Sequence, residues 1–204
     1  MKRKIFISIN IPDKVKKRLV KAVEKWADSP PHQEFRSDGD ITQKNTNSWC
    51  GGLPVKWTKE ANLHITLLFL GYVDEETLLE VCQKVREVVG SEDIFDIEFD
   101  RIELFPSATD PKMVALTGPT NADLLRLNEK IEKELNIFTS AKKTFRPHIT
   151  LGRGRKYKWE ALKSKPSIEE KYPLVITAET IDVMASDFGD GNSEYTIIES
   201  CPLR

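Results

Sequence analysis

The sequence predicts an α+β protein. Three segments carry apolar residues at the spacing of an amphipathic helix, and several shorter segments alternate apolar and polar residues as strands do. The chain of 204 residues suits one large domain or two small lobes that share a cleft. Hydrophobic residues make up 39% and charged residues 31%, which argues against disorder and fits an ordinary globular protein.

The chain is expected to begin with a strand and a helix, followed by a long polar connection. Residues 4–10 form the strand. The helix begins at Asp13 and ends near Asp28, before two prolines that cannot continue it. Its apolar face consists of Val15, Leu19, Ala22, Val23 and Trp26. Residues 28–54 are rich in Ser, Asp, Asn, Gly and Pro, so we expect a mobile polar loop of the kind that serves as a lid or binding loop.

The middle of the chain is expected to alternate strands with two helices. The strands are residues 55–58, 63–70, 94–105 and 113–117. Gly71 is expected to close the second of them, and Asp74 and Asn121 are suited to cap the helices. The inward residues of the helices are Leu78, Val81, Cys82, Val85 and Val88, and then Leu124, Leu127, Ile131 and Leu135.

The last part of the chain is expected to contain strands at residues 147–151, 176–186 and 195–199. The final two are read as a hairpin across a turn at residues 189–192. Pro166 and Pro173 are expected to break the stretch between residues 151 and 176.

Composition argues against several classes of protein. No apolar run approaches the ~18–20 residues needed to cross a bilayer. The apolar N-terminal stretch contains polar residues and stops at Pro12, which favours a strand over a signal peptide. The three cysteines are Cys50, Cys82 and Cys201. They are widely spaced and odd in number, which argues against a disulfide framework or a cysteine-based zinc site and predicts a reducing cytoplasm.

Charge is balanced overall but uneven along the chain. The net charge of −1 and a pI of about 6.4 argue against a protein that coats long nucleic acid. Residues 142–158, however, contain seven Lys or Arg and no acid. Such a segment alone would be read as a solvated loop, but His148 lies within it.

Two near-identical tetrapeptides stand out. Residues 64–67 and 148–151 both read His-Ile-Thr-Leu, and they contain two of only three histidines in the chain. Because side chains alternate along a strand, Leu63, Ile65, Leu67 and Phe69 are expected to face the core in the first copy, and Ile149 and Leu151 in the second. His64 with Thr66, and His148 with Thr150, are then expected to project together from the opposite face.

This pattern suits proton transfer around a phosphate. Two imidazoles can divide the work, one deprotonating an attacking water and the other protonating the departing oxygen. Threonine hydroxyls can hydrogen-bond non-bridging oxygens, and an arginine can neutralise the developing charge. A lone strand histidine would be read as structural. A zinc site would need a third ligand, and the remaining histidine, His32, lies in the polar loop, so we expect no metal and no cofactor.

With these motifs, the chain resembles the 2H phosphoesterases, and among them the RNA 2′,3′-cyclic phosphodiesterases, also known as 2′-5′ RNA ligases. The resemblance extends over residues 5–12, Trp57, residues 62–71, residues 146–153 and the final hairpin. It implies a single bilobal α+β domain over residues 1–204. It also implies two antiparallel sheets with outer helices, related by pseudo-two-fold symmetry around a central cleft.

The resemblance further implies roles for particular residues. His64 would be the acid that protonates the leaving 3′ oxygen, and His148 the base that activates water. Thr66, Thr150 and Arg153 would bind the phosphate, and Phe6 is either a base-stacking ring or simply part of the core. Strict alternation, however, places Arg153 on the side away from His148, so its role requires a twist or bulge at Gly152.

The implied reaction is hydrolysis of an RNA 2′,3′-cyclic phosphate to a 2′-phosphomonoester. The expected partners are RNA ends or small cyclic nucleotides, with no membrane and no obligate protein partner. Two alternatives stay open at this point. They are 2′-5′ ligation of tRNA halves, which some members of the family perform, and nucleotide binding without catalysis.

Overall fold

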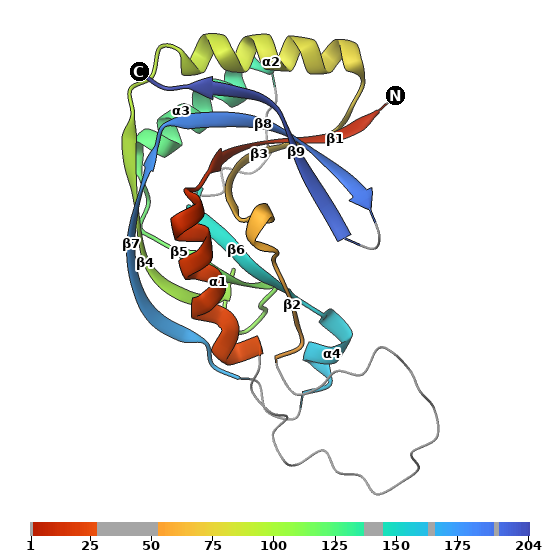
Figure 1. The fold of residues 1–204 in the computed structure, drawn as a ribbon, viewed down its shortest axis with the longest axis vertical. Coiled ribbons are helices and arrows are strands. Elements are labelled where there is room, and N and C mark those ends of the chain that lie inside the picture. Colours follow the sequence, from red (N-terminus) through yellow and green to blue (C-terminus); the bar gives the residue numbers. More distant parts are fainter. Residues whose placement is uncertain (1, 28–52, 137–144, 163–165, 190–191) are drawn as a thin grey trace, which may run out of the picture.

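A computed structural model describes residues 2–27, 53–136, 145–162, 166–189 and 192–204 (Figure 1). The helices are α1 (Asp13–Ala27), the short 3₁₀ helix η1 (Glu60–Asn62), α2 (Glu75–Val89), α3 (Ala122–Glu134) and α4 (Lys156–Glu160). The strands are β1 (Arg3–Asn10), β2 (Val55–Trp57), β3 (His64–Val73), β4 (Phe95–Phe105), β5 (Met113–Thr117), β6 (His148–Gly154), β7 (Glu169–Ala178), β8 (Thr180–Gly189) and β9 (Asn192–Pro202).

The described strands form one antiparallel sheet in the order β7-β4-β5-β6-β3-β1-β8-β9, with β2 paired to β6. The central strands β3 and β6 meet through a single residue pair, Ile65 opposite Ile149. Four strands of this order therefore lie on each side of the seam. The α+β class and the antiparallel pairing are confirmed. The two expected sheets are joined at the seam into one hydrogen-bonded sheet.

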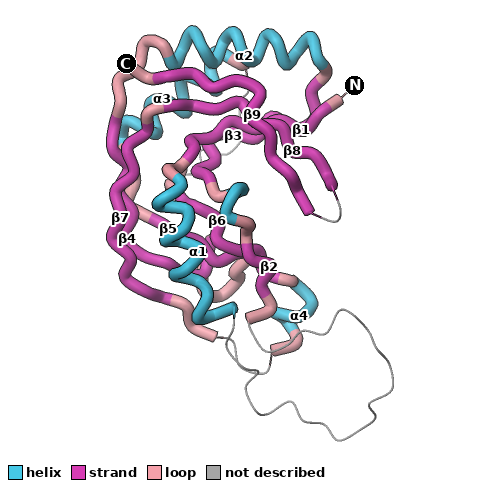
Figure 2. Tube along the Cα trace, in the orientation of Figure 1, coloured by secondary structure: helices cyan, strands magenta, loops and turns pink. Residues whose placement is uncertain are grey.

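The helices divide between the two halves of the sheet (Figures 1 and 2). α2 and α3 lie together beside β8 and β9, whereas α1 lies across β4, β5 and β6. Two contacts tie α1 to β7, an ion pair between Lys25 and Glu170 and a hydrogen bond that the Tyr172 hydroxyl donates to the Arg18 carbonyl. The apolar faces of the helices and strands form one core, in which Ile65 and Ile149 are fully buried.

Several local expectations are confirmed. α1 begins at Asp13, and the carboxylate of Asp74 accepts a hydrogen bond from the Thr77 amide at the start of α2. The side chain of Asn121 accepts one from the Leu124 amide at the start of α3. These caps satisfy amide groups that have no partner inside the helix. Most of the polar loop at residues 28–54, including Cys50 and His32, lies outside the described residues.

Two strand boundaries differ from the expectation. Gly71 does not end β3, because it adopts a φ of 77° within an irregular pairing with β1 and the strand continues to Val73. Residues 176–178 do not belong to the closing hairpin, since they end β7, which pairs with β4 in the other half of the sheet. Pro173 lies within β7. It is tolerated because β7 is an edge strand, where one row of backbone groups needs no partner.

Candidate active site

The seam between β3 and β6 brings the two His-Ile-Thr-Leu segments side by side. Because Ile65 lies opposite Ile149 in antiparallel strands, His64 faces Thr150 and Thr66 faces His148 across the seam. In this register the two histidines are diagonal neighbours, about 7–8 Å apart at the backbone. The two His-Ile-Thr-Leu segments therefore present both histidines and both threonines on one face of the central strands.

Each imidazole is oriented by the carbonyl two residues before it. The Nδ1 atom of His64 lies 2.7 Å from the Asn62 carbonyl oxygen, and that of His148 lies 2.9 Å from the Arg146 carbonyl oxygen. A carbonyl oxygen only accepts hydrogen bonds, so each Nδ1 carries a hydrogen. In the neutral ring each Nε2 is then the acceptor, and that of His64 lies 2.9 Å from the Thr66 hydroxyl oxygen.

Both central strands contain an extra residue directly after the threonine. In β3, Thr66 pairs with Ser8 but Leu68 pairs with Ile7, which leaves Leu67 as the extra residue. In β6, Thr150 pairs with Ala115 but Gly152 pairs with Val114, which leaves Leu151 as the extra residue. An extra residue of this kind reverses the faces taken by the side chains that follow it.

The bulges bring the fifth residue after each histidine onto the histidine face. Arg153 therefore lies on the same side of β6 as His148, as the proposed phosphate contact requires. The expectation that Phe69 faces the core is wrong. Its side chain is 59% exposed, and its ring centroid lies 5.9 Å from that of Phe6.

Gly152 is needed where β2 crosses the bulge in β6. A Cβ atom at this position would lie 2.4 Å from Cγ1 of Val55 and 2.8 Å from Cε3 of Trp57. Val55 is part of the buried core, so it has little freedom to move. Glycine thus lets β2 pack closely beside the segment that carries Arg153.

Burial and positive charge lower the pKa of both histidines. Burial is the main cause of the lowering of the His64 pKa to about 4, and the charges of Arg153, His148 and Lys16 add to it against the opposing effect of the hydrogen bond to Asn62. Burial likewise lowers the pKa of His148, with further lowering by Arg153 and Arg146. Both rings are therefore neutral near pH 7 in this structure.

Arg153 supplies positive charge near both histidines. Its side chain is exposed, and among the described residues it makes no hydrogen bond or ion pair. Its charge lowers the pKa of both histidines, so it lies close enough to both rings to interact with them electrostatically.

Aromatic rings support both imidazoles. Phe6 is 2% exposed, and its ring centroid lies 5.0 Å from that of His64 and 5.0 Å from that of Tyr195. In this conformation the ring packs against His64, and a base could stack on it only if its neighbours moved. On the other strand, Phe105 stacks on His148 with ring centroids 4.7 Å apart. The sequence did not single out Tyr195 or Phe105, because neither lies near a histidine in the chain.

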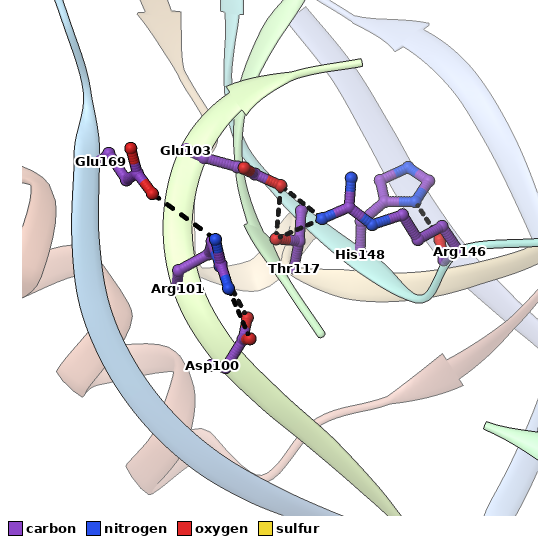
Figure 3. Close-up of polar contacts among 7 residues, drawn as sticks. All are labelled: Asp100, Arg101, Glu103, Thr117, Arg146, His148 and Glu169. Atoms are coloured by element: carbon purple, nitrogen blue, oxygen red, sulfur yellow. Dashed lines mark hydrogen bonds and ion pairs between the residues drawn. The ribbon is translucent and has the colours of Figure 1, made fainter. Parts of the chain in front are cut away.

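A charged network lies beside His148 (Figure 3). One carboxylate oxygen of Glu103 accepts a hydrogen bond from Arg146 at 2.6 Å and one from the Thr117 hydroxyl at 2.8 Å. Figure 3 shows the Arg146 guanidinium next to the His148 ring. The sequence placed Arg146 only within the basic segment, and nothing in it linked this residue to Glu103.

Two absences concern the described residues only. They contain no group of three or more His, Cys, Asp or Glu side chains that could hold a metal ion. None of the helices in this part of the chain is long and apolar enough to span a membrane. Cys82 and Cys201 are both buried and free.

Comparison with known proteins relates this site to a family. The family model described as LigT-like phosphoesterase matches residues 40–116, which include β3 and its His64. An RNA 2′,3′-cyclic phosphodiesterase of Thermotoga maritima is 26% identical over 98% of this chain and 95% of its own length. A protein of the same description from Archaeoglobus fulgidus is 37% identical over 48% of this chain and 56% of its own. These matches relate the chain to the LigT-like phosphoesterases.

Solved structures share the fold of this chain. The protein TT0787 of Thermus thermophilus superposes with a TM-score of 0.71 at 23% identity, covering 98% of both chains. Escherichia coli LigT complexed with 3′-AMP superposes with a TM-score of 0.69 at 18% identity, covering 100% of this chain and 99% of its own. At these identities the likeness concerns the fold.

Proposed function

We propose that this protein hydrolyses the 2′,3′-cyclic phosphate at RNA ends to a 2′-phosphomonoester, by a metal-independent reaction. The observation that supports the proposal is the pairing of Ile65 with Ile149, which brings two histidines and two threonines together on one face of the central strands. The activity named for the relatives from Thermotoga maritima and Archaeoglobus fulgidus supports the same reaction.

In the proposed reaction the two histidines act on opposite sides of the phosphorus. Nε2 of His148 takes a proton from water as the water oxygen forms a bond to phosphorus. The bond between phosphorus and O3′ breaks, and His64 gives its proton to O3′. One water molecule is consumed, and the 2′-phosphate remains on the ribose. The orientation of both rings by carbonyl groups suits this role, because each Nε2 is the atom left for proton transfer.

Three side chains would hold the phosphate during this reaction. Thr66 and Thr150 would donate hydrogen bonds to non-bridging oxygens, and Arg153 would offset the charge that develops there. In this structure the Thr66 hydroxyl lies by Nε2 of His64, and that of Thr150 lies 3.4 Å from the sulfur of Met113. A cyclic phosphate would therefore displace a contact that each hydroxyl makes within the protein.

Phe69 is a better candidate than Phe6 for holding the base. Both rings lie on the histidine face of neighbouring strands, and Phe6 is almost fully covered whereas Phe69 is exposed. An aromatic face can stack on any base, so this contact would not by itself select a sequence.

Domain organisation, partners and location are part of the same proposal. Residues 1–204 would act as one bilobal domain, and its partners would be RNA ends or small cyclic nucleotides, with no obligate protein partner. A cytoplasmic location fits the two buried free cysteines. Ligation of RNA and binding without turnover are outcomes that the following experiment separates from hydrolysis.

The experiment incubates the purified protein with a nucleoside 2′,3′-cyclic phosphate and with a short RNA that ends in one, with and without EDTA. Phosphorus NMR identifies the product. Both substrates are expected to give a 2′-phosphate, and EDTA is expected to leave the rate for each substrate unchanged. Tight binding without product would favour a binding module, and loss of product with EDTA would mean that a metal takes part.

A further inference from the structure

Arg146 contacts His148 through its backbone and the strands β4 and β5 through its side chain. Its carbonyl oxygen receives the Nδ1 hydrogen of His148. Its guanidinium donates to Glu103, and one of its nitrogens lies 3.4 Å from the Thr117 hydroxyl. Because β6 begins at His148, the peptide that carries this carbonyl lies before the sheet pairing of that strand. The side-chain contacts therefore tie it to β4 and β5, in addition to its covalent link to β6.

Glu103, which accepts the hydrogen bond from Arg146, is itself held in place by Thr117. Thr117 is fully buried and lies opposite His148 in the pairing of β5 with β6. Its hydroxyl donates to the same carboxylate oxygen of Glu103 that receives the hydrogen bond from Arg146. The Glu103 side chain is 21% exposed and the Arg146 side chain 41% exposed, so the ion pair is only partly shielded from water.

The ring of His148 is also supported from its face. Phe105 stacks on the imidazole with the two planes 21° apart, and the Arg146 guanidinium lies 5.6 Å from the centroid of the same phenyl ring. Arg146 thus supplies the carbonyl that receives the Nδ1 hydrogen of His148, and its guanidinium also lies over the phenyl ring that stacks on the imidazole.

The imidazole of His64, on β3, is oriented in a comparable way. Asn62, two residues before His64, receives the Nδ1 hydrogen of that ring on its carbonyl. Its side-chain amide donates to the Ser193 carbonyl at 2.8 Å, on a different strand. In both halves, therefore, the residue that orients the imidazole is fixed by a long-range contact of its own side chain.

We propose that Glu103 and Arg146 are positioning residues for His148, with Glu103 acting through Arg146. They hold the Arg146 carbonyl where it keeps a hydrogen on Nδ1 and leaves Nε2 directed at the phosphate. The catalytic part of this inference rests on the proposed function. The orientation of the ring does not, and it is measured separately.

The test compares Glu103→Ala with Glu103→Gln, and Arg146→Met with Arg146→Lys. Arg101→Ala is a matched control, because Arg101 lies on the same strand and pairs with Asp100 and Glu169 away from His148 (Figure 3). Glu103→Ala and Arg146→Met are expected to lower kcat by about 10–100-fold, the usual effect of a misplaced catalytic group, with KM within about twofold. The glutamine and lysine variants should recover most of kcat, because each can still form the bond to its partner. Arg101→Ala should keep wild-type kcat.

Nitrogen NMR of His148 tests the positioning in the resting protein, whether or not turnover is found. Wild type is expected to show the Nδ1–H form, and Glu103→Ala a mixture of both neutral forms. Unchanged kcat and an unchanged His148 spectrum in Glu103→Ala would overturn the inference. A rise in KM alone would also overturn it, since Arg146 would then bind substrate rather than position His148. A wild-type protein without turnover but with the expected NMR change would refute the proposed function and keep the positioning.

Discussion

Binding of an anion between the two histidines is expected to raise the pKa of His64 and protonate its imidazole. The ring has a pKa of about 4 in this structure, and the positive groups around it include Arg153. An acid that protonates a leaving oxygen must itself be protonated in the substrate complex. The phosphate charge therefore has to raise the pKa of His64 on binding, and proton uptake should accompany the binding of any anion of similar shape.

The size of the effect follows from the pKa. At pH 7 a group with a pKa of about 4 is protonated in about one molecule in a thousand. Raising that pKa to about 7 requires about 4 kcal/mol of favourable interaction with the anion. One unit charge about 4 Å away supplies about 4 kcal/mol at an effective dielectric constant of about 20, so a bound phosphate is sufficient.

Sulfate is the suitable probe, because its charge does not change between pH 5 and 8. Titration calorimetry in buffers of different ionisation enthalpy measures both its affinity and the protons taken up. At pH values between the pKa of His64 in the free protein and its pKa in the sulfate complex, each bound proton should raise the affinity for sulfate about tenfold per unit fall in pH. His64→Asn should take up about one proton fewer than wild type. Equal uptake by the two proteins, or sulfate binding without a pH dependence, would refute this reasoning.

Three further predictions concern stability and substrate binding. Gly152→Ala should lower the free energy of unfolding by about 1–3 kcal/mol in denaturant titration, because the added Cβ meets Val55 at 2.4 Å. Gly154→Ala, whose Cβ would meet nothing closer than 3.5 Å, should leave it nearly unchanged, and equal losses would contradict the packing argument. The pKa of His64 is about 4 in the folded protein and 6.5 in the unfolded chain, so between pH 4 and pH 6.5 the unfolded chain binds more protons. The free energy of unfolding should therefore fall by about 3 kcal/mol as the pH is lowered from 6.5 to 4. His64→Asn should lose that part of the slope, and an unchanged slope would count against the buried neutral ring. Phe69→Ala should raise KM for a cyclic nucleotide about tenfold or more at similar kcat in steady-state assays, and an unchanged KM would exclude stacking there.

Much of the fold followed from local patterns. The caps at Asp74 and Asn121 and the alternation around Ile65 and Ile149 are local properties, and the structure has them as expected. The pairing of β3 with β6 is a long-range property. The resemblance to a family predicted two sheets around a shared cleft, but not this pairing, which joins them into one sheet.

The bulges could not be predicted from alternation. Both His-Ile-Thr-Leu segments read as regular strands, yet one extra residue in each moves Phe69 and Arg153 to the histidine face. The glycine at position 152 signalled an irregularity in β6, but the signal did not fix which residue was extra. Nothing comparable marked Leu67 in β3, so Phe69 was wrongly placed in the core.

The network around His148 was missed for a different reason. Glu103 and Arg146 are 43 residues apart in the chain, and their contact depends on the order of β4, β5 and β6 in the sheet. No local pattern encodes such a contact. The proline in β7 misled for a related reason, since whether Pro173 breaks a strand depends on that strand lying at a sheet edge.

The most direct test of the two-histidine mechanism is the kcat of His64→Ala, His148→Ala and the double variant on a nucleoside 2′,3′-cyclic phosphate. Each single variant is expected to lose about 10²–10⁴-fold in kcat while retaining a wild-type fold by circular dichroism. The double variant should lose about as much as the slower single one, because both groups act in one step. Wild-type turnover by either single variant would contradict the mechanism.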